Sequence, residues 1–249
     1  MKLLLTSAGI KNPSIHEALV DLLGKPIDES DALCIPTAIY AFPGGAQSAW
    51  QLISGRAASP LCELGWKSLG VLELTALPSI ERAHWTTVVE QTDALLVGGG
   101  DPLYLCYWIH ESGLTDLFPS LRETVWVGVS GGSLVMAPNV GEEFVYGSRP
   151  TTGGDTALGL VDFAMFPHLD HEAMPDHSMA NAERSAAGIS GPAYAIDDET
   201  AIRVVDGSVE VVSEGTGSCS IPARRQASRH RSRAHRSAGP ACGNDLRAD

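Results

Sequence analysis

The stretch of the chain best suited to chemistry runs from Val125 to Pro138 and reads VWVGVSGGSLVMAP. Its Gly128-x-Ser130-x-Gly132 pattern is that of a nucleophile elbow, a serine on a sharp turn between a strand and a helix. Small neighbours let such a cramped turn close, and the N–H groups that begin the helix favour an oxyanion there. Because glycine and serine also alternate in ordinary turns, the flanking strand and helix are what favour a nucleophile at Ser130.

A serine nucleophile needs a base to take its proton and an acid to orient that base. His168 follows the apolar run 163–167, so it should lie at a strand end. The acidic residues 197–199 follow a second such run, 194–196, and fit the orienting role. A surface-loop histidine and a solvated acidic turn are the plain alternatives.

Three glycines, Gly98 to Gly100, end another buried run and would let backbone N–H groups approach a developing oxyanion. A simple strand-to-helix connection is the alternative. Histidines at 168, 171 and 177 lie among acidic residues, but no helical HExxH motif is present. We therefore expect neither a metal site nor a cofactor.

Strands and helices alternate up to Ser130. The predicted strands are 2–8, 32–39, 69–74, 93–97 and 125–129, and the predicted helices are 12–23, 47–61, 79–91 and 103–109. Their apolar, non-alternating strands favour an α/β fold with a mostly parallel sheet and helices on both faces. Ligands of such sheets bind at the carboxyl ends of the strands, where the glycine loop and Ser130 both fall.

The second half is expected to add antiparallel strands to the same domain. Strands are predicted at 144–148, 159–166 and 194–196, followed by a hairpin of 200–205 and 208–213 around Asp206-Gly207. After residue 214 the apolar periodicity ends, so we expect one catalytic domain, 1–214, and a basic, disordered tail, 215–249. Two interpretations of the tail stand: a genuine basic segment, or a shifted reading frame that replaces Gly-His-Trp-Lys-Leu-Phe by Gly215-Thr-Gly-Ser-Cys-Ser220.

Composition describes a globular protein of 249 residues with no apolar run long enough to span a membrane. Residues 222–249 contain seven arginines and two aspartates, which leaves 10 basic and 28 acidic side chains in 1–221. So acidic a body disfavours nucleic acid as a partner. Five scattered cysteines without a CxxC motif fit a reduced cytosol, and we expect a cytoplasmic protein.

Four motifs together resemble the peptidase E family of serine peptidases, which includes α-aspartyl dipeptidase and cyanophycinase. In chain order they are Gly98-Gly-Gly-Asp101, Gly128-Val-Ser-Gly-Gly-Ser133, Phe166-Pro-His168 and Ala195-Ile-Asp-Asp-Glu-Thr-Ala201. The resemblance covers about residues 2–214. It implies a fold like that of class I glutamine amidotransferases and a Ser-His-Glu triad.

Carried onto this chain, the resemblance makes Ser130 the nucleophile, His168 the general base and Glu199 the orienting acid. It implies an oxyanion hole formed by the N–H of Gly131 with that of Gly99 or Gly100. Ser133, the second serine of the turn, is expected to be structural.

The chain departs from the family pattern at three places. Glycine replaces the usual alanine at Gly131, and aspartate replaces a frequent asparagine at Asp101, which puts a carboxylate near the substrate. In α-aspartyl dipeptidase an arginine downstream of the histidine receives the aspartyl side chain. Arg184 does not align cleanly with that position, and Arg149 is the other candidate, so a preference for N-terminal Asp stays open.

We therefore expect a serine peptidase that hydrolyses dipeptides or small peptides through an acyl-enzyme, as a monomer or homodimer. An esterase of the α/β-hydrolase kind would have its acid before its histidine, the reverse of the order here. A glutamine amidotransferase would have cysteine at Ser130. A catalytically silent binding protein of the same fold is the alternative from another class.

Overall fold

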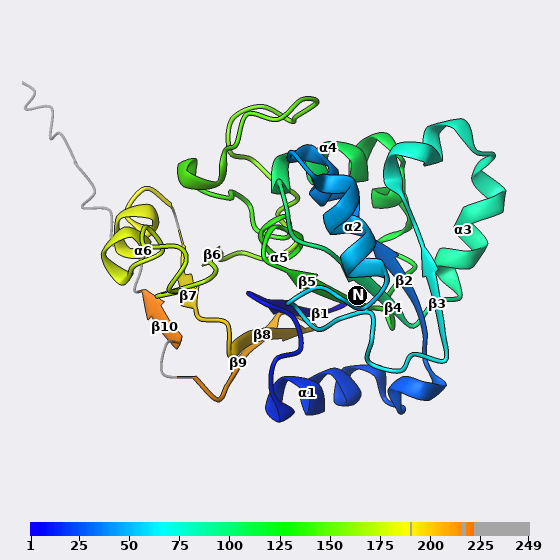
Figure 1. The fold of residues 1–249 in the computed structure, drawn as a ribbon, viewed down its shortest axis with the longest axis horizontal. Coiled ribbons are helices and arrows are strands. Elements are labelled where there is room, and N and C mark those ends of the chain that lie inside the picture. Colours follow the sequence, from blue (N-terminus) through cyan, green and yellow to red (C-terminus); the bar gives the residue numbers. More distant parts are fainter. Residues whose placement is uncertain (190, 216–217, 222–249) are drawn as a thin grey trace, which may run out of the picture.

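A seven-stranded sheet forms the centre of the computed structural model, which describes residues 1–189, 191–215 and, for the backbone, 218–221 (Figure 1). Its strand order is β3-β2-β4-β5-β1-β8-β9, and the first five of these strands run parallel. These five are β1 (Lys2–Thr6), β2 (Asp31–Ile35), β3 (Ser68–Val71), β4 (Ala94–Val97) and β5 (Val125–Val129). The expected α/β fold with a mostly parallel sheet is confirmed.

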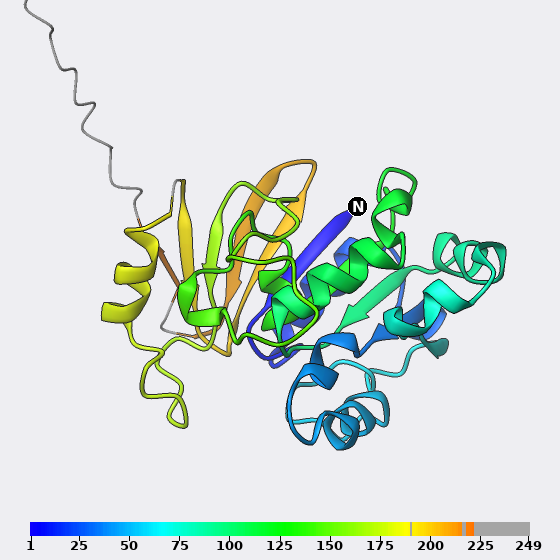
Figure 2. The ribbon, with the colours of Figure 1, turned by 90° about the horizontal axis from the view of Figure 1, so that it is seen from above.

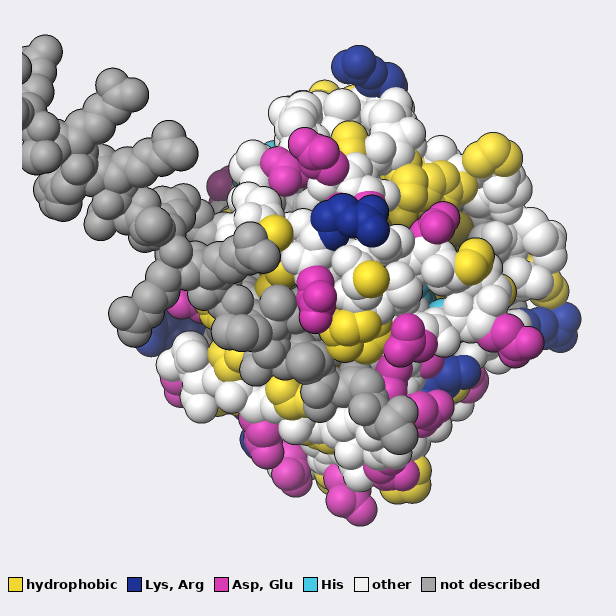
Figure 3. Space-filling view, turned by 90° about the vertical axis from the view of Figure 1, so that its left-hand side faces the viewer, with side chains coloured by type: hydrophobic (Ala, Val, Ile, Leu, Met, Phe, Trp, Pro, Cys, Tyr) yellow, Lys and Arg dark blue, Asp and Glu magenta, His cyan; other side chains and the backbone are white. Residues whose placement is uncertain are grey.

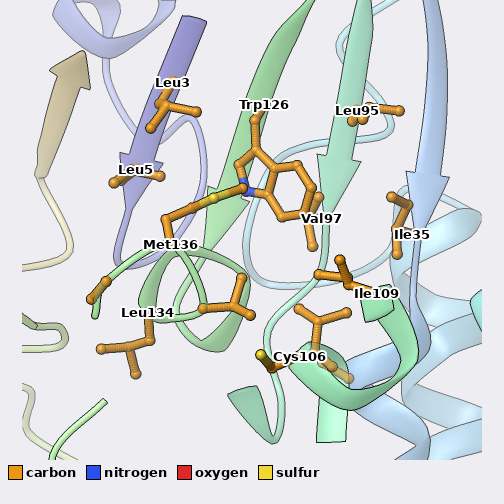
Figure 4. Close-up of a cluster of buried hydrophobic side chains, with 14 of the residues drawn as sticks. Leu3, Leu5, Ile35, Leu95, Val97, Cys106, Ile109, Trp126, Leu134 and Met136 are labelled. Atoms are coloured by element: carbon orange, nitrogen blue, oxygen red, sulfur yellow. The ribbon is translucent and has the colours of Figure 1, made fainter. Parts of the chain in front are cut away.

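Helices cover both faces of this sheet, because successive residues of the apolar strands point to opposite sides. Leu4 and Val127 pack in one core cluster with α1 (Pro13–Leu23) and α2 (Gly45–Ile53). Their neighbours in the strands, such as Leu5 and Trp126, pack in the other cluster with α3 (Arg82–Glu90), α4 (Pro102–Glu111) and α5 (Gly131–Leu134) (Figure 4). Each side of the parallel strands is therefore core.

The antiparallel extension is a hairpin that joins the main sheet. β8 (Thr200–Val205) pairs antiparallel with β1 and with β9 (Ser208–Ser213). Asp206 and Gly207 have φ of 49° and 77°, the left-handed conformations that a two-residue hairpin turn needs. The predicted hairpin and its turn are confirmed.

A second, three-stranded sheet lies beside the first, next to α6 (Met179–Ala186) (Figures 1 and 2). Its centre is β7 (Ala193–Ile196), which runs parallel to β6 (Ala164–Phe166) and antiparallel to β10 (Ser218–Ile221). β10 falls inside the segment that we expected to lack regular structure, so the folded domain extends beyond residue 214. The remainder of the expected tail, 222–249, lies outside the described residues.

Three of the predicted elements that differ from the structure do so near a glycine with positive φ. α2 ends at Ile53 rather than near residue 61, before Gly55. No strand forms at 144–148. A 3₁₀ helix, Glu142–Phe144, overlaps the start of this segment, and Gly147 within it has a φ of 75°. The strand predicted at 159–166 is only β6, and Gly159 begins the irregular part. None of the described helices has the length and apolarity that a membrane crossing requires.

Candidate active site

Ser130 occupies a sharp turn between β5 and α5. Its φ of 49° and ψ of −112° lie outside the regions that most residues adopt, a strained backbone of the kind found at functional turns. Its N–H donates to the carbonyl of Thr6 at 2.9 Å, and its own carbonyl accepts from the N–H of Leu134 at 2.9 Å. A Cβ at Gly128 would lie 2.5 Å from the carbonyl oxygen of Gly132, so the turn closes only because Gly128 has no side chain.

Ser133 fixes this turn to the neighbouring strand. Its buried hydroxyl accepts from the N–H of Thr6 at 3.0 Å and donates to the carbonyl of Thr6 at 2.9 Å. The indole N–H of Trp126 donates to the carbonyl of Gly132 at 2.9 Å. These contacts agree with the structural role expected for Ser133.

The three glycines expected at an oxyanion hole surround the serine. A Cβ at Gly99 would lie 3.3 Å from the Cβ of Ser130, and one at Gly131 would press against the carbonyl of Gly100. Within the described part of the chain, the N–H groups of these glycines have no hydrogen-bond acceptor. α5 is a single turn, so any stabilisation of an anion here comes from individual N–H groups rather than from a long helix dipole.

His168 is the second residue after the end of β6. Like Ser130, it has a positive φ, 58°. Its backbone N–H donates to the hydroxyl of Ser7 at 3.0 Å, and that hydroxyl donates to the carbonyl of Ile196 at 3.0 Å. The fully buried Ser7 therefore ties the end of β1 to the ends of β6 and β7. This arrangement holds the histidine at the carboxyl edge of the sheets.

The carboxylate that contacts His168 in the structure is that of Asp198, whereas the family resemblance implies Glu199 as the orienting acid. Nδ1 of His168 lies 2.7 Å from Oδ1 of Asp198. The Glu199 carboxylate instead accepts from Nδ2 of Asn12 at 3.0 Å. Asp197 explains the difference, because its carboxylate accepts from the N–H of Glu199 at 3.1 Å. That side-chain turn directs the consecutive side chains of 198 and 199 to different partners.

Asp198 also faces a second histidine. Nε2 of His171 lies 3.6 Å from Oδ2 of Asp198, while Nδ1 of His171 accepts from the N–H of Ala173. Burial raises the pKa of Asp198, but the hydrogen bond and charge of His168, with the charges of His171 and Lys11, lower it further than burial raises it. The net pKa lies below the ordinary value, so Asp198 is ionised at neutral pH and suits the orienting role.

Ser130 and His168 line the same cavity, of about 350 Å³. Gly99 and Gly100 also line it. Ser130, His168 and two glycines of the 98–100 loop therefore lie around one space that a substrate can enter, and Asp198 contacts His168. No group of three or more His, Cys, Asp or Glu side chains that could hold a metal ion occurs within the described ranges.

The three residues expected to bind substrate lie elsewhere. Asp101 is 1% exposed and caps α4, accepting from the N–H groups of Leu103 and Tyr104 at 2.9 and 3.0 Å. Arg149 is exposed and lies outside the residues that line either this cavity or the larger one described next. Neither position supports direct contact with a substrate at Ser130.

Arg184 lines a separate cavity of about 700 Å³ and donates to Oδ1 of Asn181 at 2.8 Å. Four carboxylates share that lining, from Glu142, Glu143, Asp155 and Asp176. Acidic side chains are also scattered over the face of the molecule near α6 (Figure 3). Arg184 is therefore a poor receptor for an aspartyl side chain, because the surrounding charge is negative.

Sequence reasoning missed Ser7 and Asn12, and the acid that it named in the 197–199 turn, Glu199, is not the one that contacts His168 in the structure. The available signal for Ser7 was its position: a hydroxyl at the carboxyl end of the first strand, on the same edge as Ser130. Asn12 was expected only as the first residue of the predicted helix 12–23, and its side chain caps that helix by accepting from the N–H of Ile15. Its contact with Glu199 joins residues 187 positions apart, which local patterns do not reveal.

Comparisons with known proteins agree with the resemblance seen in the motifs. The model of Peptidase family S51 matches residues 3–212. A cyanophycinase from Geminocystis herdmanii is 29% identical over 189 residues, which cover 72% of this chain and 68% of that protein. A peptidase E from Nostoc sp. is 24% identical over 160 residues, which cover 58% of this chain and 61% of the relative, less than two thirds of its length.

A solved structure gives the same result for the fold. The crystal structure of a peptidase from an acI-B1 Actinobacterium matches with a TM-score of 0.62 and 19% sequence identity, covering 86% of this chain and 88% of that one. At this identity the likeness concerns the fold alone. The α/β architecture and the resemblance to the peptidase E family are both confirmed.

Proposed function

The chain belongs to Peptidase family S51, and on this premise we propose that it is a serine peptidase of small peptides, with Ser130 as nucleophile, His168 as general base and Asp198 as the acid that orients the base. The observation that supports these roles best is the 2.7 Å contact of Asp198 with Nδ1 of His168, at a cavity that His168 shares with Ser130. An ionised carboxylate at Nδ1 keeps the proton on that nitrogen and leaves Nε2 free to accept one.

In the acylation step, the Ser130 Oγ attacks the carbonyl carbon of the scissile peptide bond while Nε2 of His168 takes the hydroxyl proton. The carbonyl oxygen becomes an oxyanion that the N–H of Gly131 and of Gly99 or Gly100 stabilise. The tetrahedral intermediate then collapses, His168 gives its proton to the leaving amine, and the C–N bond breaks. The acyl group stays on Ser130 as an ester.

Water reverses the roles in the second step. His168 removes a proton from water, the hydroxide attacks the ester carbonyl, and the same N–H groups hold the oxyanion. Collapse returns the proton to Ser130 Oγ and releases the carboxylic acid product. Asp198 stays ionised throughout and stabilises the imidazolium that forms in each step.

Small peptides suit the dimensions of the site, since the cavity at Ser130 measures only about 350 Å³. A preference for N-terminal Asp receives no support from the cations expected to bind it. Arg184 lies among four carboxylates in the other cavity, and Arg149 lines neither. We therefore propose the peptidase activity without an aspartyl preference.

Two measurements test this function. A fluorophosphonate should label the wild-type protein and not Ser130→Ala, while the matched variant Ser133→Ala should still be labelled. Wild-type protein should also release free amino acids from a dipeptide panel, and Ser130→Ala should not. Folded wild-type protein that resists the label and cleaves no peptide would show instead a silent binding protein. Cleavage of esters alone would show the esterase.

A further inference from the structure

The cavity at Ser130 has few of the groups that would recognise a charged side chain. Besides Ser130, His168 and the glycines, its walls are formed by apolar side chains, with three neutral polar ones at Ser48, Gln51 and Ser59. The apolar members are Ile39, Phe42, Pro43, Leu52, Ala57, Ala58 and Val129. Among the residues that the structure describes, no Lys, Arg, Asp or Glu lines this cavity, and His168 is the one ionisable side chain there.

The shape of the cavity floor depends on Gly98, which has no side chain. A Cβ at Gly98 would lie 2.7 Å from Cδ2 of Leu52 and 3.2 Å from Cδ1 of Ile39. Glycine at this position lets both aliphatic side chains approach the strand end next to the oxyanion loop. Leu52 is buried and belongs to the main core, so this part of the wall is fixed by packing.

The outer wall is aromatic. The ring of Phe42 packs edge-on against that of Tyr146 at a centroid distance of 5.1 Å. The contact joins the segment before α2 to the loop that follows residue 144. Tyr146 lines the other cavity, whereas Phe42 lines this one and is 36% exposed, so a substrate bound here would cover apolar surface of Phe42 that now faces water.

Nearby cations are engaged outside the cavity. The guanidinium of Arg56 lies over the ring of Trp50, 5.0 Å from its centroid. The ammonium of Lys11 donates to the carbonyl of Ala58 at 3.3 Å, which places it at the rim. A carboxylate that entered the cavity would lose water without gaining a partner inside, whereas an aliphatic side chain would gain from the same transfer.

We propose that this cavity is a specificity pocket for an apolar side chain, of the size of leucine or methionine, on a residue next to the scissile bond. The proposal rests on the peptidase function and names its substrate class: small peptides with an aliphatic residue at the cleavage point. The same chemistry suits the residue on either side of the bond, and the substrates below separate the two.

The test compares kcat/KM of the wild type for Leu-Ala, Ala-Leu, Asp-Ala, Ala-Asp and Ala-Ala. Leucine on the side that enters the pocket should raise kcat/KM over Ala-Ala by about 10- to 200-fold, the range for added methylenes in an apolar pocket. Aspartate on that side should lower kcat/KM below that of Ala-Ala. A gain with Leu-Ala places the pocket on the acyl side, and a gain with Ala-Leu places it on the leaving side.

A matched pair of variants tests the pocket itself. Gln51 and Gln47 are both exposed on α2, but only Gln51 lines the cavity. Gln51→Arg should reduce the preference for leucine and raise activity on the aspartyl substrate of the same side, while Gln47→Arg should leave both unchanged. Equal effects of the two variants, or none from Gln51→Arg, would overturn the proposal.

Failure of the proposal and failure of the peptidase function are distinguishable. Wild type that is labelled by fluorophosphonate but prefers aspartyl over leucyl substrates would overturn the apolar pocket and leave the peptidase intact. Loss of that aspartyl preference in Lys11→Gln would then identify the rim ammonium as the receptor. Folded protein that neither reacts with the label nor cleaves any of the five dipeptides would overturn both.

Discussion

Asp198 and His168 are joined by a 2.7 Å contact between a carboxylate oxygen and Nδ1 of the imidazole. Both side chains are largely shielded, with 25% and 14% of their surfaces exposed. The contact joins residues 30 positions apart that follow adjacent parallel strands, β7 and β6. It decides which of three consecutive acids can serve the base, and the first prediction depends on it.

Asp198→Asn should lower kcat by about 10³- to 10⁴-fold, because an amide at Nδ1 favours the wrong tautomer of the histidine. Glu199→Gln is the matched control, since its carboxylate contacts Asn12 rather than His168. It should keep kcat near that of the wild type. Steady-state hydrolysis of a cleaved dipeptide measures both, and a greater loss in Glu199→Gln would restore the assignment made from the sequence.

Asp198 should also make stability depend on pH in the acid range. Its folded pKa is lowered, so between that value and the ordinary value of about 3.9 the unfolded chain binds more protons than the folded one. Stability from this group is therefore complete above the ordinary value and is lost as pH falls through the folded pKa. Urea unfolding of wild type and Asp198→Asn from pH 2 to 6 should show their stabilities converging at the acid end. A difference in stability between the two proteins that stays constant from pH 2 to 6 would contradict this prediction.

Alanine variants of the two serines in the elbow should have different effects: one should lose activity and the other should lose stability. Ser130→Ala should abolish hydrolysis with the free energy of unfolding almost unchanged, since no hydrogen bond of its hydroxyl occurs in the described part of the chain. Ser133→Ala should remain active but lose about 1–3 kcal/mol, because the buried N–H and carbonyl of Thr6 lose a partner. Denaturant unfolding and dipeptide hydrolysis of the two variants are the measurements; an inactive, stable Ser133→Ala would be inconsistent with these roles.

Ser7→Ala should lower kcat by displacing His168, although Ser7 does not contact the substrate. The N–H of His168 would lose its acceptor, and a shift of the imidazole by a fraction of an ångström should reduce kcat by about 10- to 100-fold. KM should stay close to that of the wild type, since Ser7 does not line the cavity. Fluorophosphonate labelling should slow with kcat. A change confined to KM would show that Ser7 acts on binding instead.

Gly131→Ala should lower the activity of this protein, although alanine is the usual residue of the family at this position. The added Cβ would press against the carbonyl of Gly100 and displace the oxyanion loop. We expect kcat to fall by about 10²-fold, comparable to the loss of one oxyanion donor. Gly188→Ala is the control, because a Cβ there would meet its nearest neighbour at an ordinary 3.6 Å. Unchanged kcat in Gly131→Ala would place the oxyanion hole elsewhere.

The sequence predicted the main sheet well because the strands at its centre are largely apolar and alternate with helices. β1, β4 and β5 lie close to the predicted positions. The hairpin was predictable because Asp206 and Gly207 are residue types that adopt the positive φ of a two-residue turn. Element ends were less predictable where a glycine turns the chain, as after α2. Ser130 and His168 could be chosen because strand ends of a parallel sheet converge on one edge.

The acid could not be chosen from the sequence with the same certainty. Asp197, Asp198 and Glu199 share a strand end and a charge, so which carboxylate reaches the histidine depends on how the turn is closed by its own hydrogen bonds. The contribution of Ser7 depends on three strand ends meeting in space. Such long-range contacts have no periodicity and leave no local pattern.

The groups proposed for catalysis are divided between the two sheets. The nucleophile follows β5 of the seven-stranded sheet, whereas the base and its acid follow β6 and β7 of the three-stranded one. A small displacement of one sheet against the other would thus change the distance from serine to histidine and leave the imidazole–carboxylate pair intact. Proton transfer between Ser130 and His168 therefore depends on the contacts that hold the two sheets in place, the shared apolar core and the hydrogen bonds of Ser7.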